Sequence, residues 1–183
     1  MKATGIVRRI DDLGRIVIPK EIRRTLRIRE GDPLEIYTDK EGEVILKKYS
    51  PIGEMSEFAS QFADSLNQTS GQISCISDRD AIIAVSGAPK KDFNEKPLSQ
   101  DLERVMEEKT TLVVKSPADK PIQIFSDETE RKYTAQVIAP IITEGDPVGA
   151  VILLSTDPNT TMGEVEAKLA QSAAGFLGKQ MEQ

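Results

Sequence analysis

Short hydrophobic runs alternate with polar turns over the first fifty residues, which is typical of β-structure. Residues 5–10 (GIVRRI) and 14–18 (GRIVI) are rich in β-branched side chains, and Asp-Asp-Leu-Gly joins them. Gly14 can supply the positive φ angle that a tight reversal needs. The pattern therefore predicts a β-hairpin over this segment.

A short helix is predicted directly after this hairpin. Pro19 suits the first position of a helix, because its missing N–H has no partner there. Ile22 and Leu26 fall four residues apart and so lie on one apolar face. The helix is expected to end before Gly31.

A second hairpin follows, and it completes a very small domain. The runs 33–38 (PLEIYT) and 43–49 (EVILKKY) flank a polar turn at 39–42. A domain of about 50 residues buries too little apolar surface to offset the entropy of ordering its backbone. Residues 1–52, which we assign to this domain, contain no cysteine or histidine that could stabilise it through a disulfide or a metal site.

The strand at residues 15–18 (RIVI) is apolar on both faces. A small open sheet with one wet side does not accommodate such a strand. We therefore expect a two-fold homodimer in which hairpins of two chains interleave into one closed barrel, which also removes the sheet edges.

Beyond residue 52 the pattern changes to longer helices and β-rich runs. Apolar residues three and four apart predict an amphipathic linking helix over about 53–67. A final helix is expected to begin at Thr161, with Glu164 closing a capping box. Helix, antiparallel strands with a helical insertion, and closing helix predict an α+β sandwich over 53–183. The predicted strands are 73–77, 81–86, 111–115, 122–125, 134–142 and 148–155, and the inserted helix is 99–106.

Charge is unevenly distributed along the chain of 183 residues, whose formal net charge is −6. Residues 1–31 carry nine basic and four acidic side chains, whereas the residues from 51 onward carry 12 basic and 21 acidic ones. The symmetry of a dimer would double the basic surface, which suits the phosphates and guanine edges of duplex DNA. The alternative is a solvated face on which Glu21, Asp11 and Asp12 pair with the arginines.

Composition argues against several classes of protein. One cysteine excludes an internal disulfide, and the absence of histidine argues against zinc sites and histidine-based catalysis, so we expect neither an enzyme nor a cofactor. Cys75 lies in an apolar run and is expected to be a small core residue. No apolar run reaches the ~18 residues of a membrane-spanning helix, and the N-terminus lacks the apolar core of a secretory signal, so a cytoplasmic location is expected.

Five short motifs follow one another in the first 37 residues: GIVR, DDLGR, VIP, EIRRTL and GDPLEIY. Together they resemble the DNA-binding domain of the AbrB family of bacterial transition-state regulators. The resemblance implies a swapped-hairpin barrel dimer, in agreement with the burial argument. It also implies DNA contacts from Arg8, Arg15, Arg23 and Arg24, with Lys2, Arg9 and Lys20 nearby as supporting phosphate contacts.

The order of elements after residue 52, and the strand pair QVIAPI and GDPVGAVILLS with its glycine turn at Gly145, resemble a GAF domain. GAF domains are sensory modules, and many bind small molecules. The cysteine that attaches a bilin and the motif of cyclic-nucleotide binders are both absent. The charged loops at 116–121 and 126–133 could line a pocket or could be solvated connections, and the effector stays unidentified.

The pairing of the two halves is similar to a regulator of sporulation in spore-forming bacteria. It implies a DNA-binding transcription regulator of sporulation genes, acting as activator or repressor. The GAF-like domain is then expected to sense an effector or to assemble two dimers into a homotetramer, whose two barrels would reach neighbouring sites on DNA.

A second interpretation comes from the same N-terminal pattern. AbrB-type barrels also serve as the DNA-binding half of antitoxins, whose remaining chain binds a protein partner and is a short, partly disordered segment. Here residues 53–183 carry the regular pattern of a folded domain. The regulator is therefore favoured, and the antitoxin-type protein is the alternative.

Overall fold

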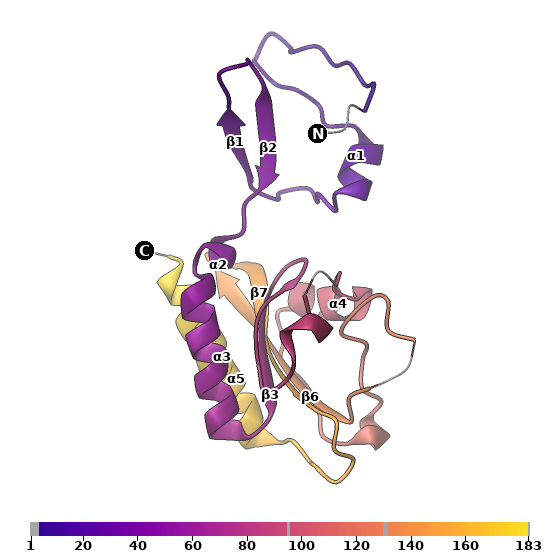
Figure 1. Cartoon of the computed structure of the whole chain (residues 1–183), viewed down its shortest axis with the longest axis vertical. Helices are drawn as coiled ribbons and strands as arrows, with labels where there is room; N and C mark the ends of the chain where they lie inside the picture. The colour runs from indigo at the N-terminus through magenta and orange to yellow at the C-terminus, as the bar shows by residue number, and fades with distance from the viewer. Residues whose placement is uncertain (1–3, 95, 130–131, 183) are drawn as a thin grey trace. The chain divides into compact units, whose positions relative to one another are not determined.

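The computed structural model describes residues 4–94, 96–129 and 132–182, and its contacts divide the chain into two compact units (Figure 1). The first unit is Met1–Tyr49 and the second is Ser50–Gln183. The division falls three residues before the boundary expected from the sequence. Each unit is described below by itself.

The first unit contains one helix and one two-stranded antiparallel sheet. The helix α1 is Lys20–Thr25, and the strands are β1, Leu34–Thr38, and β2, Val44–Lys48. The strands pair in register from Leu34 opposite Lys48 to Thr38 opposite Val44. This is the second hairpin that the sequence predicts.

The first predicted hairpin forms only its loop within one chain. The Asp11 N–H donates to the Arg15 carbonyl over 3.1 Å, and the Gly14 N–H donates to the Asp11 carbonyl over 3.0 Å. Gly14 has a φ of 76°, the left-handed value expected from the sequence. The flanking residues 5–10 and 15–18 are not paired as strands, so that part of the prediction is wrong for the single chain.

These two segments lack both a backbone partner and a surface on which to bury their apolar side chains. Their apolar side chains stay in solvent, with 85% of Val7, 65% of Ile10 and 72% of Val17 exposed. A β-strand needs a neighbouring backbone to satisfy its N–H and C=O groups and a surface on which to bury its apolar face. Neither is present for these segments within one chain.

The helix α1 also differs from its prediction in two details. Pro19 is the residue before the helix and not its first position. The helix ends at Thr25, and Leu26, expected on the buried face, is 57% exposed. Arg27 has a φ of 53°, a left-handed backbone that cannot continue a right-handed helix.

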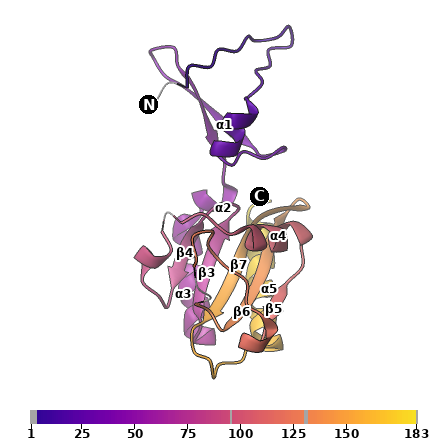
Figure 2. The same ribbon diagram turned by 90° about the vertical axis from the view of Figure 1, so that its right-hand side faces the viewer.

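The second unit is built on a five-stranded antiparallel sheet in the order β4-β3-β7-β6-β5 (Figure 2). The long pair β6 and β7 lies between β3 and β5, and the bulge between Ile141 and Ile142 interrupts its register. The strands are β3, Ile73–Asp78; β4, Ile82–Ser86; β5, Leu112–Val114; β6, Ala135–Thr143; and β7, Asp146–Ser155.

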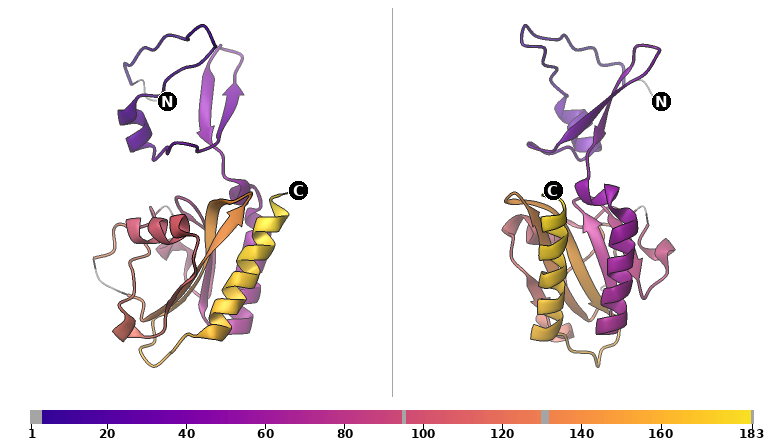
Figure 3. Two further views of the ribbon diagram at one scale, coloured as in Figure 1. Left: turned by 180° about the vertical axis from the view of Figure 1, so that it is seen from behind. Right: turned by 90° about the vertical axis from the view of Figure 1, so that its left-hand side faces the viewer.

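Helices cover both faces of this sheet. The helices α3, Ser56–Ser70, and α5, Glu164–Gln180, lie side by side on one face, as the right-hand view of Figure 3 shows. The helix α4, Gln100–Glu108, lies on the other face with the long loops that precede and follow it. The single helical turn α2, Pro51–Glu54, leads into α3. This arrangement is the α+β sandwich that the sequence predicts.

Two helices of the second unit differ from their predicted bounds. The linking helix is interrupted at Met55, which separates α2 from α3. The last helix begins at Glu164 and not at Thr161. The carboxylate of Glu166 accepts the Gly163 N–H over 2.8 Å, so the cap lies two residues later than predicted.

The segment 122–125 (IQIF), predicted as a strand, makes only one isolated bridge, between Phe125 and Leu98. Side chains take the place of a partner strand. The buried amide of Gln136 accepts the Ile122 N–H over 3.0 Å and donates to the Ile122 carbonyl over 2.7 Å. The carboxylate of Glu128 accepts the N–H groups of Ile124 and Phe125. The backbone is thus satisfied without a ladder.

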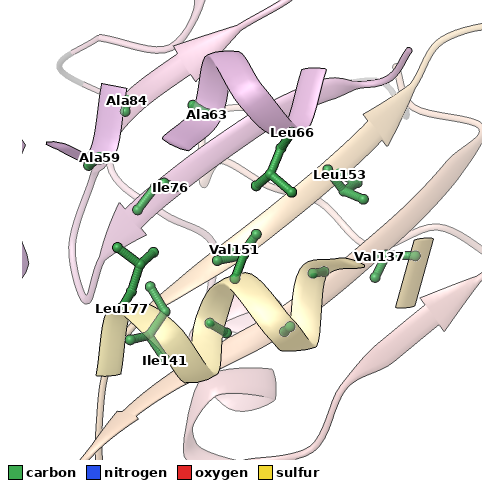
Figure 4. Packing of buried hydrophobic residues seen from close by; sticks show 14 of the residues in the cluster. Ala59, Ala63, Leu66, Ile76, Ala84, Val137, Ile141, Val151, Leu153 and Leu177 are labelled. Carbon is green, nitrogen blue, oxygen red and sulfur yellow. The ribbon is translucent and has the colours of Figure 1, made fainter. Parts of the chain in front are cut away.

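Two apolar cores lie on opposite faces of the sheet. In the core beneath α3 and α5, Ala63 and Leu66 of α3 face Ile76 and Val151 of the sheet, and Leu177 of α5 packs beside Ile141 (Figure 4). The core beneath α4 contains Cys75, which is fully buried, as predicted. Burial raises the pKa of its thiol, so the group stays neutral. Other members of that second core are Phe93, Leu98, Leu102, Met106, Phe125 and Tyr133.

Two glycines of α5 provide a matched test of the packing of α5 on β6. A Cβ at Gly178 would lie 2.2 Å from the Ile142 carbonyl oxygen, whereas a Cβ at Gly175 would meet nothing within 4 Å. We expect Gly178→Ala to destabilise the second unit by about 1–3 kcal/mol through overpacking, and Gly175→Ala to stabilise it by about 0.5–1 kcal/mol through helix propensity. Scanning calorimetry of the full chain measures both, and equal shifts of the two variants would contradict the close packing.

Candidate nucleic-acid interface

The loop of the first hairpin presents Arg15 together with Asp11. One Asp11 carboxylate oxygen, Oδ1, accepts the backbone N–H groups of Leu13 over 3.0 Å and of Arg15 over 2.8 Å. The other, Oδ2, accepts the Arg15 Nε–H over 2.8 Å. The Arg15 side chain is 69% exposed. The guanidinium is thus hydrogen-bonded to its own loop through Nε, while most of the side chain is exposed to solvent.

The helix α1 presents the next three predicted contact residues. Lys20 opens the helix and Arg24 lies in its last turn, and both are exposed. Arg23 is half-buried, and its Nε is buried without a hydrogen-bond partner among the described residues. An unsatisfied buried donor carries a free-energy cost, so an acceptor from another molecule would stabilise it. Arg23 is thus less exposed than Lys20 and Arg24.

The remaining predicted contact residues lie before the loop. Arg8 and Arg9 are exposed in the segment that approaches Asp11. Lys2 lies outside the described residues.

The alternative interpretation, in which acidic neighbours neutralise the arginines, fits only one of these positions. Among residues 4–49, Arg15 is the one predicted contact residue with a carboxylate partner. Arg8, Arg9, Lys20 and Arg24 make no ion pair there. Their charges are available to a ligand.

A buried carboxylate supports the chain between α1 and β1, and sequence reasoning missed it. The Asp32 side chain is 4% exposed. It accepts the Arg29 N–H over 2.8 Å and lies 3.7 Å from the Lys48 Nζ, which also donates to the Arg27 carbonyl over 2.8 Å. These contacts join the end of α1 to β2. The motif Gly31-Asp32 was the available signal, because an acidic residue after a glycine turn is placed to cap nearby N–H groups.

In the second unit, the loops at 116–121 and 126–133, interpreted from the sequence as either pocket walls or solvated connections, use Asp119 and Glu128 for hydrogen bonds to nearby backbone. Glu128 folds back onto its own loop, and burial, as the largest cause, raises the pKa of its carboxyl group despite two hydrogen bonds from the backbone. The Asp119 carboxylate accepts the Lys115 N–H over 3.0 Å. Beneath the loops, the rings of Phe93 and Phe125 pack edge to face, 5.6 Å apart.

The outer surface of α3 and α5 carries three aromatic rings in contact. Phe176 stacks on Phe58 and Phe62, with ring centroids 6.0 and 5.6 Å apart. Phe176 is 44% exposed, and the two other rings are half-buried. We call these three residues the aromatic patch.

No helix among residues 4–94, 96–129 and 132–182 is long and apolar enough to cross a membrane.

Comparisons with known proteins give the class of each half. A family model described as "Stage V sporulation protein T C-terminal, transcription factor" matches residues 54–182, and one described as "Antidote-toxin recognition MazE, bacterial antitoxin" matches residues 7–54. The chain is therefore a transcription factor with an AbrB/MazE-type N-terminal domain. It belongs to the stage V sporulation protein T family.

Two relatives from Bacillus subtilis (strain 168) agree with this assignment. The chain is 58% identical to stage V sporulation protein T over 185 aligned residues, which cover 100% of both chains. It is 67% identical to the transition state regulatory protein AbrB over 51 residues, 28% of this chain and 52% of AbrB. The predicted AbrB-family resemblance is confirmed.

Solved structures give the fold of the second unit. The GAF domain of a phosphoenolpyruvate-protein phosphotransferase from Acinetobacter aligns with a TM-score of 0.59 at 9% identity, over 69% of this chain and 81% of that one. The cofactor-binding GAF domain of the nutrient sensor CodY from Clostridium difficile aligns with a TM-score of 0.52 at 16% identity, over 71% and 92%. At such identities the likeness shows the GAF fold alone, and it confirms that prediction.

The family assignment also confirms two functional predictions. The chain is a transcription regulator of a sporulation-associated family, and it is not an enzyme. The individual contact residues are tested by none of these comparisons and stay predictions.

The Asp32 contacts can be tested by removing the carboxylate. We expect Asp32→Ala to lower the free energy of opening of the first unit by about 1–3 kcal/mol, because it leaves the Arg29 N–H without this acceptor and the Lys48 ammonium without this counter-charge. Amide hydrogen exchange at 34–38 and 44–48 in the full chain measures it. Glu41→Ala, in the exposed loop of the same hairpin, is the control. Equal exchange rates in the two variants would show that the Asp32 carboxylate does not stabilise the first unit.

Proposed function

We propose that this chain binds duplex DNA as a homodimer through its first unit and controls transcription of sporulation genes. The observation that carries the proposal is that four basic side chains of the first hairpin and α1 are exposed and pair with no carboxylate among residues 4–49: Arg8, Arg9, Lys20 and Arg24. The basic contact residues proposed are Arg8, Arg15, Arg23 and Arg24, with Lys2, Arg9 and Lys20 in support.

The dimer is inferred from apolar surface that one chain leaves in solvent. Val7, Ile16, Val17, Ile36 and Val44 are each more than half exposed. Burying a side chain of this size stabilises a protein by about 1.5–3 kcal/mol, so several such positions favour association strongly. Hairpins of a second chain would bury them and supply the backbone partners that residues 5–10 and 15–18 lack.

Phosphate contacts are expected to dominate the affinity. The proposed residues come from a loop and a helix of six residues, which offers no long recognition helix for the major groove. Arginine and lysine on such elements bind mainly the regularly spaced phosphates, and DNA shape and flexibility then contribute to the choice of sequence. We expect degenerate target sites.

The proposed link to sporulation rests on the relative whose alignment covers both entire chains, which is named for that process. An identity of 58% over both entire chains favours a shared role. Activation and repression are both compatible with this role.

We further propose that the second unit assembles two dimers into a tetramer through the aromatic patch. Rings in contact on the outer surface of two adjacent helices resemble the centre of a protein interface, where aromatic side chains are enriched. A second copy of the patch would cover Phe176 and its neighbours by two-fold symmetry. Two barrels on one tetramer would then bind neighbouring DNA sites with a higher effective affinity.

A small-molecule effector of the second unit stays a prediction of the sequence. The roles of Glu128 and Asp119 within their own loops support the interpretation of these loops as structural connections. An effector would act by binding one assembly state better than another.

The antitoxin-type interpretation draws support from the MazE model over residues 7–54. The remainder of the chain weighs against it, because residues 50–183 form a domain with two cores of their own and not a short segment that folds on a partner.

DNA binding is tested by Arg24→Ala, with Lys40→Ala in the loop of the second hairpin as a control of equal charge. Each dimer loses two guanidinium groups, so we expect about tenfold weaker binding and a salt slope smaller by about two. Mobility shifts on a 40-base-pair duplex at several salt concentrations measure both. Equal affinity and slope in the two variants would count against the proposed surface.

The tetramer is tested by Phe176→Ser, with Val165→Ser as the control because Val165 is exposed on the same helix outside the aromatic patch. We expect Phe176→Ser to sediment as a dimer and Val165→Ser as a tetramer, because loss of the central ring removes apolar area from the interface. Analytical ultracentrifugation with far-UV circular dichroism separates dissociation from unfolding. A tetramer that survives Phe176→Ser would exclude the patch as the interface.

A further inference from the structure

The two hairpin loops of the first unit share one construction. In each, an aspartate precedes the loop and a glycine with positive φ ends it: Asp11 with Gly14, and Asp39 with Gly42. Each aspartate uses Oδ1 to accept two backbone N–H groups, two and four residues further on. The distances are 3.0 and 2.8 Å for Asp11 and 3.0 and 2.9 Å for Asp39. This oxygen stabilises the loop in both hairpins.

The loops differ in the use of the second oxygen. In the second hairpin, the Asp39 Oδ2 makes no hydrogen bond or ion pair within residues 4–49, and the residue four positions on is Glu43. In the first hairpin the residue four positions on is Arg15, and the Asp11 Oδ2 accepts its Nε–H over 2.8 Å. Loop stability does not require this contact, because the second hairpin forms its loop without it.

The contact orients a flexible side chain. An arginine guanidinium is planar, so holding Nε at one acceptor limits the directions in which the two terminal nitrogens point. Those nitrogens make no hydrogen bond or ion pair within the described part of the chain and form the end of the fork that matches two phosphate oxygens or the O6 and N7 of guanine. Hydrogen bonds from the Arg15 backbone and side chain lower the pKa of the Asp11 carboxyl group, which keeps it ionised.

A carboxylate beside a DNA-binding arginine has an electrostatic disadvantage. DNA phosphates repel it, so as a bare charge it weakens binding to every duplex. Closing the loop through Oδ1 does not offset this disadvantage for DNA binding, whereas ordering Arg15 through Oδ2 offsets it by improving contacts with particular sequences. Asp12, the next residue, carries the same charge on the same loop and contacts no partner among the described residues.

We propose that Asp11 is a positioning residue that holds the Arg15 guanidinium by its Nε and so directs its terminal nitrogens toward DNA for sequence discrimination. The proposal rests on the DNA binding proposed above. It assigns to one carboxylate two separable tasks, with Oδ1 closing the loop and Oδ2 orienting the arginine.

The experiment measures the affinity of the full chain for two duplexes. One is a 40-base-pair duplex that the unaltered protein selects from a randomised library, and the other has the same bases in shuffled order. The variant Asp11→Asn keeps an oxygen that can accept the two backbone N–H groups but places an amide nitrogen, which cannot accept, before the Arg15 Nε. Asp12→Asn removes the same charge without changing the contact between Asp11 and Arg15.

The two variants are expected to differ in discrimination. Asp12→Asn should bind both duplexes somewhat more tightly, with an unchanged ratio of affinities, because it only removes a negative charge. Asp11→Asn should lower the ratio of selected to shuffled affinity by about tenfold, which is the scale of one bidentate contact. The same ratio in the two variants would overturn the proposal.

Substitutions of Arg15 separate failure of this proposal from failure of DNA binding. If Arg15→Ala leaves both affinities unchanged, the proposed role of Arg15 itself is wrong. If Arg15→Ala weakens binding while Asp11→Asn behaves like Asp12→Asn, DNA binding stands and the positioning role is wrong. Adding Asp11→Asn to Arg15→Ala should lower the ratio no further.

A second variant tests the same proposal with Asp11 unchanged, so the result does not depend on how Asp11→Asn folds. Arg15→Lys keeps the charge but has neither Nε nor a planar fork. Its ratio of selected to shuffled affinity is expected to fall to that of Asp11→Asn. Full discrimination by Arg15→Lys would overturn the proposal without any change at Asp11.

Discussion

The first unit depends on one constraint: a chain of 49 residues with a two-stranded sheet and a six-residue helix cannot bury its own apolar side chains. Val7 and Val17 lie in solvent, and the segments that carry them are not paired as strands. The association proposed above would therefore be part of the folding of this unit. The same association would bring two copies of the loop at Asp11–Arg15 and of α1 into one symmetric surface.

Basic and acidic side chains are separated between the two units. The N-terminal residues gather basic side chains, while the second unit is acidic and uses several of its carboxylates to cap its own backbone, as Glu128 and Glu166 do. An acidic second unit does not compete for DNA phosphates. Net charge over the whole chain conceals this separation.

The second unit is a complete domain, because helices or loops cover both faces of its sheet. A Cβ added at Gly178 would collide with the Ile142 carbonyl of β6, which shows how closely α5 packs there. The aromatic patch on the outside of α3 and α5 is the surface through which we propose that two dimers assemble. The domain's interior is occupied by its own side chains, including the paired rings of Phe93 and Phe125.

Hydrophobic periodicity, glycine turns and the charge distribution are local properties, and the sequence alone determined what depends on them. These features are the second hairpin, the loop ending at Gly14, the order of helices and strands along the second unit and the basic character of the first unit. Tertiary structure decided what depends on distant partners. The side chain of Gln136, which lies 14 residues further along in β6, bonds the backbone of Ile122, where a partner strand was predicted. Likewise, residues 5–10 and 15–18 have strand-forming side chains but no strand within one chain, because a β-strand is completed only by a neighbouring backbone.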